Sequence, residues 1–114
     1  MLKIRPEQMV VLEEYMVRQF EARMAVHLRW VFADELKTIT EMELKKQVRL
    51  GVEKAAQYQI TKKSDVQRYL EYAVVYGWAF DTIQWVGEIL QRKDWDGEKK
   101  MDKIEQYEWI SEKR

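Results

Sequence analysis

The chain contains no cysteine, a single proline and only four glycines. Without cysteine it can form neither a disulfide nor a thiolate metal site, which fits a cytoplasmic protein. Because proline and glycine most often interrupt regular structure, their scarcity leaves long stretches free to be helical. The apolar residues recur every three or four positions along nearly the whole chain, and this is the spacing of amphipathic helices.

The chain also lacks an excess of either charge, because twenty Lys and Arg are balanced by twenty Asp and Glu. This balance argues against a nucleic-acid binder, whose affinity depends largely on neutralising phosphates. A net charge of zero also removes much of the electrostatic repulsion that keeps copies of a small domain apart.

No segment of the sequence suits a membrane span. The longest uncharged run, Tyr72 to Phe80, is far shorter than the roughly 20 apolar residues that a span requires. The N-terminal residues lack the unbroken apolar region and the small-residue cleavage site of a secretory signal. We therefore expect a soluble, cytoplasmic chain with no membrane partner.

The first predicted helix is long, running from Pro6 to about Phe32. Proline suits a first helical turn, where no N–H is needed. A second helix is predicted to begin after Thr40, with Glu43 completing a T-x-x-E capping box, and to end before Ile60. Gly51 inside this helix suggests a close crossing with another helix. The apolar stripe of the first helix comprises Met9, Leu12, Met16, Phe20, Met24, His27 and Val31.

Three shorter helices are predicted to follow. Ser64 is expected to cap a helix over Asp65–Tyr76, and Gly77 to end it. Asp81 is expected to cap a fourth helix that finishes near Lys93. A turn then leads to a last helix at roughly Glu98–Glu112. Together these elements predict an all-α, single-domain bundle of about five helices, with a long first helix, over the whole chain.

His27 is the only histidine, and the sequence offers it no catalytic partner. Nucleophilic catalysis would need a cysteine, or a serine on a strand–turn–helix elbow, and neither is present. His27 lies in line with Met24 and Val31 on the first helix. We therefore interpret it as a packed or partly buried structural residue.

Other catalytic and ligand sites also lack their sequence signatures. The di-metal bundle motif Glu-x-x-His fails because Met24 stands three residues before His27, and no phosphate-binding glycine motif occurs. The carboxylates that invite acid–base chemistry are interpreted as surface charges and helix caps, and we expect no catalytic, cofactor or metal site. They are Glu13, Glu14, Asp34, Glu35 and Asp81.

Aromatic residues are abundant, with five Trp, six Tyr and three Phe in 114 residues. A core of five helices cannot easily bury all of them, and Tyr and Trp are enriched at protein interfaces. We predict that Tyr72, Tyr76 and Trp78 point outward and bind a protein partner. The rings predicted to pack inside are Tyr69, Phe80 and Trp85.

Residues 58–104 contain the pattern Y-x-I, D-V-x-x-Y-L, Y-G-x-x-F-D, W-x-x-x-I-L and D-G-x-x-K-M-D-x-I. This pattern resembles a family of small helical proteins met in bacterial gene clusters for type VI secretion, near genes for spike proteins, effectors and effector chaperones. Gln59 departs from it, because a glycine is expected there. The matching positions, in about half of the chain, are Tyr58, Ile60, Asp65, Val66, Tyr69, Gly77, Phe80, Asp81, Trp85, Ile89, Leu90, Gly97, Met101 and Asp102.

The resemblance implies an accessory role and brings no catalytic residues. Our leading hypothesis is a non-enzymatic adaptor or chaperone that binds a secretion effector or a spike component. The alternatives are an immunity protein that inhibits a secreted toxin, a self-assembling subunit or homodimer whose first helix pairs with its twin, and a small hydrolase or metal enzyme that uses the carboxylates.

Overall fold

The computed structural model describes residues 6–112, and the side chains of residues 14–108. α1 is the longest helix, with 26 residues. The predicted all-α fold with a long first helix is confirmed. In the described range the chain forms five α-helices and no strand: α1 (Pro6–Val31), α2 (Glu41–Gln57), α3 (Lys63–Tyr76), α4 (Gln84–Leu90) and α5 (Gly97–Glu112), with a 3₁₀ turn at Phe80–Thr82.

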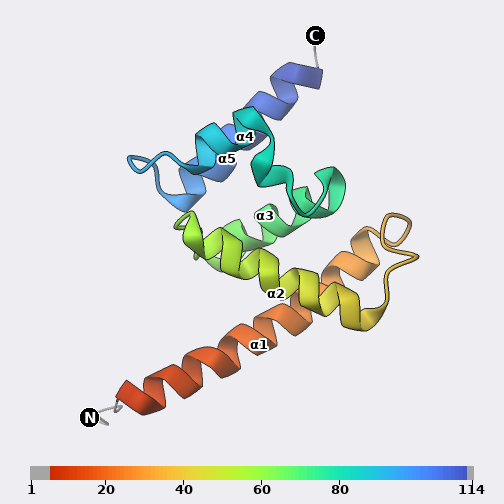
Figure 1. Ribbon diagram of the computed structural model, residues 1–114, viewed down its shortest axis with the longest axis vertical. Helices are drawn as coiled ribbons and strands as arrows, with labels where there is room; N and C mark the ends of the chain where they lie inside the picture. The colour runs from red at the N-terminus through yellow and green to blue at the C-terminus, as the bar shows by residue number, and fades with distance from the viewer. Residues whose placement is uncertain (1–5, 113–114) are drawn as a thin grey trace.

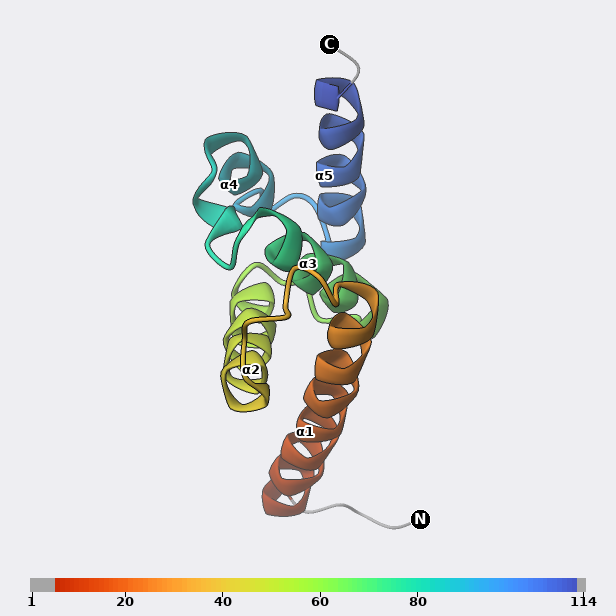
Figure 2. The same cartoon turned by 90° about the vertical axis from the view of Figure 1, so that its right-hand side faces the viewer.

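The helices are arranged around α3 (Figure 1). α1 and α2 pack against each other and both contact α3, while α5 also packs on α3 and α4 packs on α5. α1 and α5 lie toward opposite ends of the molecule, which measures 56 × 38 × 20 Å (Figure 2). The N-terminal part of α1 projects beyond the other described helices.

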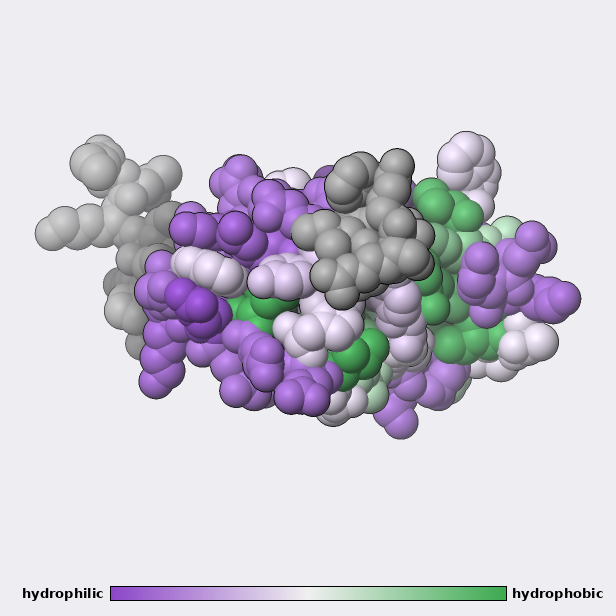
Figure 3. Space-filling model, turned by 90° about the horizontal axis from the view of Figure 1, so that it is seen from above, coloured by the Kyte–Doolittle hydropathy of each residue, from purple (hydrophilic) through white to green (hydrophobic). Residues whose placement is uncertain are grey.

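One hydrophobic cluster connects all five helices. Each helix contributes at least one side chain that is fully buried: Leu28, Leu44, Leu70, Leu90 and Ile104. Outside this cluster polar side chains cover much of the surface, with apolar groups visible between them (Figure 3). The core therefore depends on contacts between helices that are far apart in the sequence.

The predicted apolar stripe of α1 is only partly buried. Phe20 and Met24 lie in the core and His27 is half-buried, but Met16 and Val31 are exposed. The first two members of the stripe lie outside the described side chains. α1 is therefore covered by its neighbours mainly from Phe20 onward.

Two predicted helix ends are confirmed. Thr40 caps α2, because its side chain accepts a hydrogen bond from the backbone N–H of Glu43 at 3.1 Å. Gly77 ends α3 with a φ of 103°, a conformation that residues with a side chain rarely adopt. Both signals are local, so the sequence alone located them.

Two predicted caps are wrong. α3 begins at Lys63 with Lys62 as its N-cap residue, so Ser64 lies inside the helix. Asp81 lies in the 3₁₀ turn rather than at the start of α4, which follows Ile83. Its carboxylate is buried and accepts a hydrogen bond from the Tyr58 hydroxyl instead of capping a helix. The predicted end of this helix near residue 93 is also wrong, because α4 stops at residue 90.

The start of α5 is anchored on the loop between α2 and α3. A Cβ atom on Gly97 would lie 3.0 Å from Ile60 Cα, so only glycine fits this approach without a shift. The fully buried Lys100 donates from Nζ to the backbone oxygen of Tyr58 at 2.7 Å and to Oε1 of Gln59 at 3.2 Å. Gln59 has a φ of 62°, a left-handed conformation that explains why glycine is expected at its position.

Candidate protein-binding cleft

Tyr72 and Tyr76, two of the three predicted partner-binding residues, lie together on α3. They are one helical turn apart, and their rings are stacked with centroids 6.1 Å apart and an interplanar angle of 15°. Tyr76 is exposed, whereas Tyr72 is half-buried and also stacks on the buried Phe80 at 6.4 Å. The pair thus presents an aromatic surface in which the exposed ring of Tyr76 stacks on Tyr72, and Tyr72 is held by the buried Phe80.

These two tyrosines form part of a cleft of about 300 Å³ between α3, α5 and the end of α1. We call it the tyrosine cleft. α3 contributes its largest share, and one aromatic ring comes from the residue that follows α1. Its lining residues are Phe32, Arg68, Glu71, Tyr72, Val75, Tyr76, Glu105 and Glu108.

The tyrosine cleft carries more negative than positive charge, because three carboxylates and one guanidinium line it. Arg68 is shared among acidic groups, lying 3.1 Å from Glu105 and 3.0 Å from Asp102. Glu108 lies close enough to the Tyr72 hydroxyl to raise the pKa of that tyrosine, second to the effect of burial. Aromatic faces and carboxylates are the groups that recognise a cationic side chain, through cation–π contact and ion pairing.

His27 contacts Glu71, one of the carboxylates that line the tyrosine cleft. Its Nε2 lies 2.9 Å from Oε2 of Glu71 and 3.3 Å from Nε2 of Gln67, and its side chain is half-buried. The position agrees with the interpretation of His27 as a packed structural residue. The contact links α1 to α3 and orients one carboxylate of the cleft.

Trp78 lies away from the two tyrosines. It is half-buried beside Gly51 of α2, where a Cβ atom on the glycine would be 3.7 Å from the indole ring. It lines a separate depression of about 390 Å³ with Leu50 and Lys54. The three predicted partner-binding residues therefore do not form one surface.

The three rings predicted to be internal differ in how deeply they are buried. Tyr69 and Phe80 are fully buried, with centroids 4.8 Å apart. Trp85 is only half-buried, and its ring lies 6.2 Å from that of Tyr107, which is exposed. The prediction is confirmed for two rings, while Trp85 lies at the edge of the core.

The candidate acid–base carboxylates lie in unlike environments. Asp81 is buried, accepts a hydrogen bond from the Tyr58 hydroxyl at 2.8 Å and pairs with Lys54 at 3.2 Å. Glu14, Asp34 and Glu35 are exposed, and the side chain of residue 13 is outside the described set. Among the described residues no three His, Asp or Glu side chains converge as metal ligands, and no described helix could cross a bilayer.

Tyrosine ionisation is suppressed in the interior, and this predicts an alkaline unfolding transition. Burial, followed by the nearby Asp81, raises the pKa of Tyr58 to about 12 and also raises the pKa of Tyr69. Burial and Glu108 raise the pKa of Tyr72. Because an unfolded tyrosine ionises near pH 10, the stability that these groups contribute is complete below pH 10 and is lost as pH rises toward 12.

We expect the phenolate absorbance of Tyr58, Tyr69 and Tyr72 to appear only together with the loss of helical circular dichroism. In the Tyr58→Phe variant the late absorbance change should shrink by one tyrosine. Complete ionisation of all tyrosines near pH 10, with the helices intact, would contradict this assignment.

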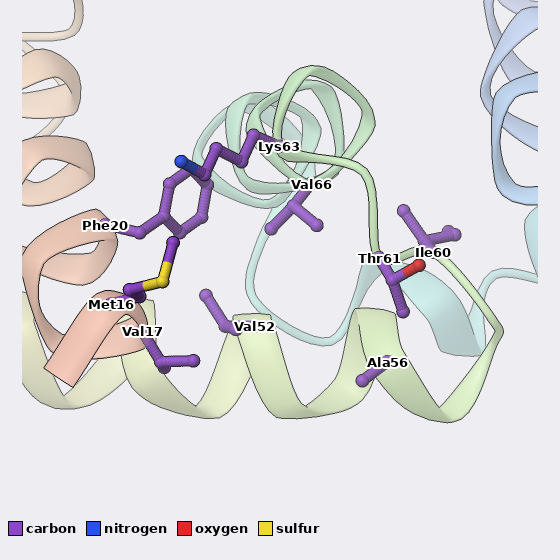
Figure 4. A pocket seen from close by; sticks show the side chains of 9 residues that line it. All are labelled: Met16, Val17, Phe20, Val52, Ala56, Ile60, Thr61, Lys63 and Val66. Atoms are coloured by element: carbon purple, nitrogen blue, oxygen red, sulfur yellow. The ribbon is translucent and has the colours of Figure 1, made fainter. Parts of the chain in front are cut away.

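A second apolar hollow, which we call the α1 groove, was not predicted from the sequence. It has a volume of about 260 Å³ and lies between the middle of α1, the C-terminal half of α2 and the start of α3. The only signal was the run of apolar residues on the first helix. Figure 4 shows its lining residues: Met16, Val17, Phe20, Val52, Ala56, Ile60, Thr61, Lys63 and Val66.

The comparisons with known proteins add no family to this description. No protein-family model, curated protein or solved structure matches the chain. The resemblance to small proteins of type VI secretion clusters therefore stays a prediction from the sequence pattern.

Proposed function

We propose that the chain is a non-enzymatic protein-binding accessory protein, an adaptor or chaperone for a type VI secretion effector or spike component. The single observation that carries the binding role is the tyrosine cleft. The secretion context comes from the sequence resemblance alone. The proposal assigns the cleft to a lysine or arginine side chain on the partner.

The chemistry of the cleft supports this choice of partner group. A lysine or arginine stem can lie along the rings of Tyr72 and Tyr76, while its charge approaches Glu105 and Glu108. Because Arg68 already pairs with several acids, it does not neutralise the lining completely. A stacked aromatic pair with one exposed ring beside carboxylates provides both apolar contact and charge selection.

The predicted result of removing the exposed ring is a loss of partner binding without a loss of fold. The Tyr76→Ala variant should bind the partner captured by the native chain at least about tenfold more weakly, which corresponds to roughly 1.4 kcal/mol. Tyr15→Ala is the matched control, because Tyr15 is an exposed tyrosine on α1, away from the cleft. Affinity capture from host cells, followed by titration calorimetry with the recovered protein, measures the effect.

Charge reversal at the rim tests the second half of the proposal. Glu105→Lys should also weaken capture of the partner relative to the native chain. Binding of the partner to the native chain should weaken as the salt concentration rises, because exposed ion pairs are screened. Equal capture by the native chain, Tyr76→Ala and Glu105→Lys would refute the assignment of the cleft. Recovery of a partner that is unrelated to secretion would refute the proposed context but not the cleft.

The acidic character of the cleft also favours a second function, inhibition of a toxin as an immunity protein. Inhibitors of this kind cover an enzyme cleft with complementary charge. Survival separates the two functions, since an immunity protein rescues cells that express the toxin and a loader does not. Loss of rescue in Tyr76→Ala, but not in Tyr15→Ala, would assign the inhibitory surface to the same cleft.

A further inference from the structure

The chain exposes more surface than a compact monomer of its mass. Its accessible area is 8495 Å², whereas a compact protein of this mass exposes about 6,700 Å². Its radius of gyration is 15.6 Å, compared with about 13 Å for a compact domain of this length. The excess area is larger than the roughly 800 Å² that each partner loses in a standard protein interface.

Part of this excess lies along α1, beside the α1 groove. Met16 and Val17 line the groove, yet their exposed fractions are 54% and 42%. Phe20, one turn further on, is buried. The α1 face that packs in the core therefore continues as a partly exposed apolar surface, since helix positions three, four or seven apart share a face.

The same helix supplies a segment of suitable chemistry for this groove. Residues 6–13 read PEQMVVLE, and positions 9, 10 and 13 continue the face of Met16 and Val17 by helical spacing. Glu13 is the charged position on this face of the segment. Lys63 is the one charged side chain among the groove's lining residues, and it lies at the start of α3 (Figure 4).

We propose that the α1 groove is the interface of a homodimer in which two α1 helices cross in antiparallel orientation about a two-fold axis near Met16 and Val17. In this arrangement residues 6–13 of each copy cover the groove of the other, and Glu13 of one copy pairs with Lys63 of the other. Two-fold symmetry fills both grooves at once, because each copy supplies one groove and one occupant. The zero net charge of the chain allows two copies to approach.

The first test is the mass of the purified chain in solution, measured by sedimentation equilibrium over a wide concentration range. The native chain should approach twice 13.9 kDa. Val17→Asp should raise the dimer dissociation constant at least about tenfold, since it places a carboxylate in an apolar contact. Val26→Asp is the matched control, because Val26 is 70% exposed on the same helix and does not line the groove.

A charge-swap experiment then tests the antiparallel register. Glu13→Lys and Lys63→Glu should each weaken the dimer when alone, because each places like charges opposite one another across the interface. An equal mixture of the two variants should recover the dimer mass, since a Glu13→Lys chain and a Lys63→Glu chain form two opposite-charge pairs. A glutamate in the first turn of α3 suits the helix dipole, so Lys63→Glu should leave the fold intact.

A native chain that stays at 13.9 kDa at every concentration would overturn the proposal. A dimer that survives Val17→Asp but dissociates in Val26→Asp would also overturn it, by placing the interface on another face. Failure of the mixture to recover the dimer would refute the antiparallel pairing. The tyrosine cleft is a separate test, because Tyr76→Ala should leave the dimer mass unchanged.

Discussion

Replacing Lys100 by glutamate is expected to destabilise the protein by about 3–5 kcal/mol. Lys100 is fully buried, and its ammonium group lies 2.7 Å from the backbone oxygen of Tyr58. Burial lowers the pKa of Lys100, so its charge is already held at a cost that its two hydrogen bonds offset. A carboxylate in its place would face carbonyl oxygens without a donor, and an unpaired buried charge costs about 3–5 kcal/mol.

The loss expected for Lys100→Glu is a substantial fraction of the roughly 5–15 kcal/mol that stabilises an ordinary domain. Lys99→Glu is the matched control, because Lys99 is the preceding residue, is exposed and undergoes the same change of charge. It should change the free energy of unfolding by less than about 0.5 kcal/mol. Urea unfolding followed by circular dichroism measures both variants, and equal stabilities would contradict the role assigned to Lys100.

A methionine at position 100 separates charge from packing. It keeps a long apolar side chain but leaves the oxygens of Tyr58 and Gln59 without their donor. We expect Lys100→Met to lose about 1–3 kcal/mol, less than Lys100→Glu, because no charge is buried. A methionine variant that is less stable than the glutamate variant would show that shape rather than charge determines this site.

The second large effect concerns the crossing of α2 and α3 at Gly51. A Cβ atom on Gly51 would lie 2.5 Å from Cδ2 of Leu70, which is fully buried. Gly51→Ala should therefore destabilise the protein by about 1 kcal/mol, since overpacking of 1–3 kcal/mol exceeds the helix-propensity gain of about 1 kcal/mol. Leu70→Ala alone should lose about 2–5 kcal/mol by leaving a cavity.

The double variant Gly51→Ala/Leu70→Ala should be more stable than Leu70→Ala by about 1 kcal/mol, because the new methyl group occupies space that the leucine left. The effect of Gly51→Ala thus changes sign with the residue at position 70. Denaturant unfolding of all four proteins measures this coupling. Additive effects, within about 0.5 kcal/mol, would show that the two side chains do not compete for the same space.

The elements that the sequence located correctly are those that depend on neighbours along the chain. The spacing of apolar residues determines a helix, so the all-α class and the long first helix followed from it. Thr40 and Gly77 act within one turn of their own helix, and both were found. The crossing at Gly51 was also anticipated, because a glycine inside a helix is unfavourable unless something packs closely against it.

The tertiary structure alone decided which distant residues meet. Asp81 has the local signature of a helix cap, but its carboxylate is buried and accepts a hydrogen bond from the Tyr58 hydroxyl instead. Lys100 is buried, and the oxygens that accept its hydrogen bonds lie about forty residues away in the chain, where only packing between helices brings them within reach. Tyr72 and Tyr76 were predicted from the sequence as binding residues, whereas two of the three carboxylates beside them, Glu105 and Glu108, come from the distant helix α5. Local interactions therefore determined the helices, and burial between helices determined the cleft, the groove and the charged groups inside.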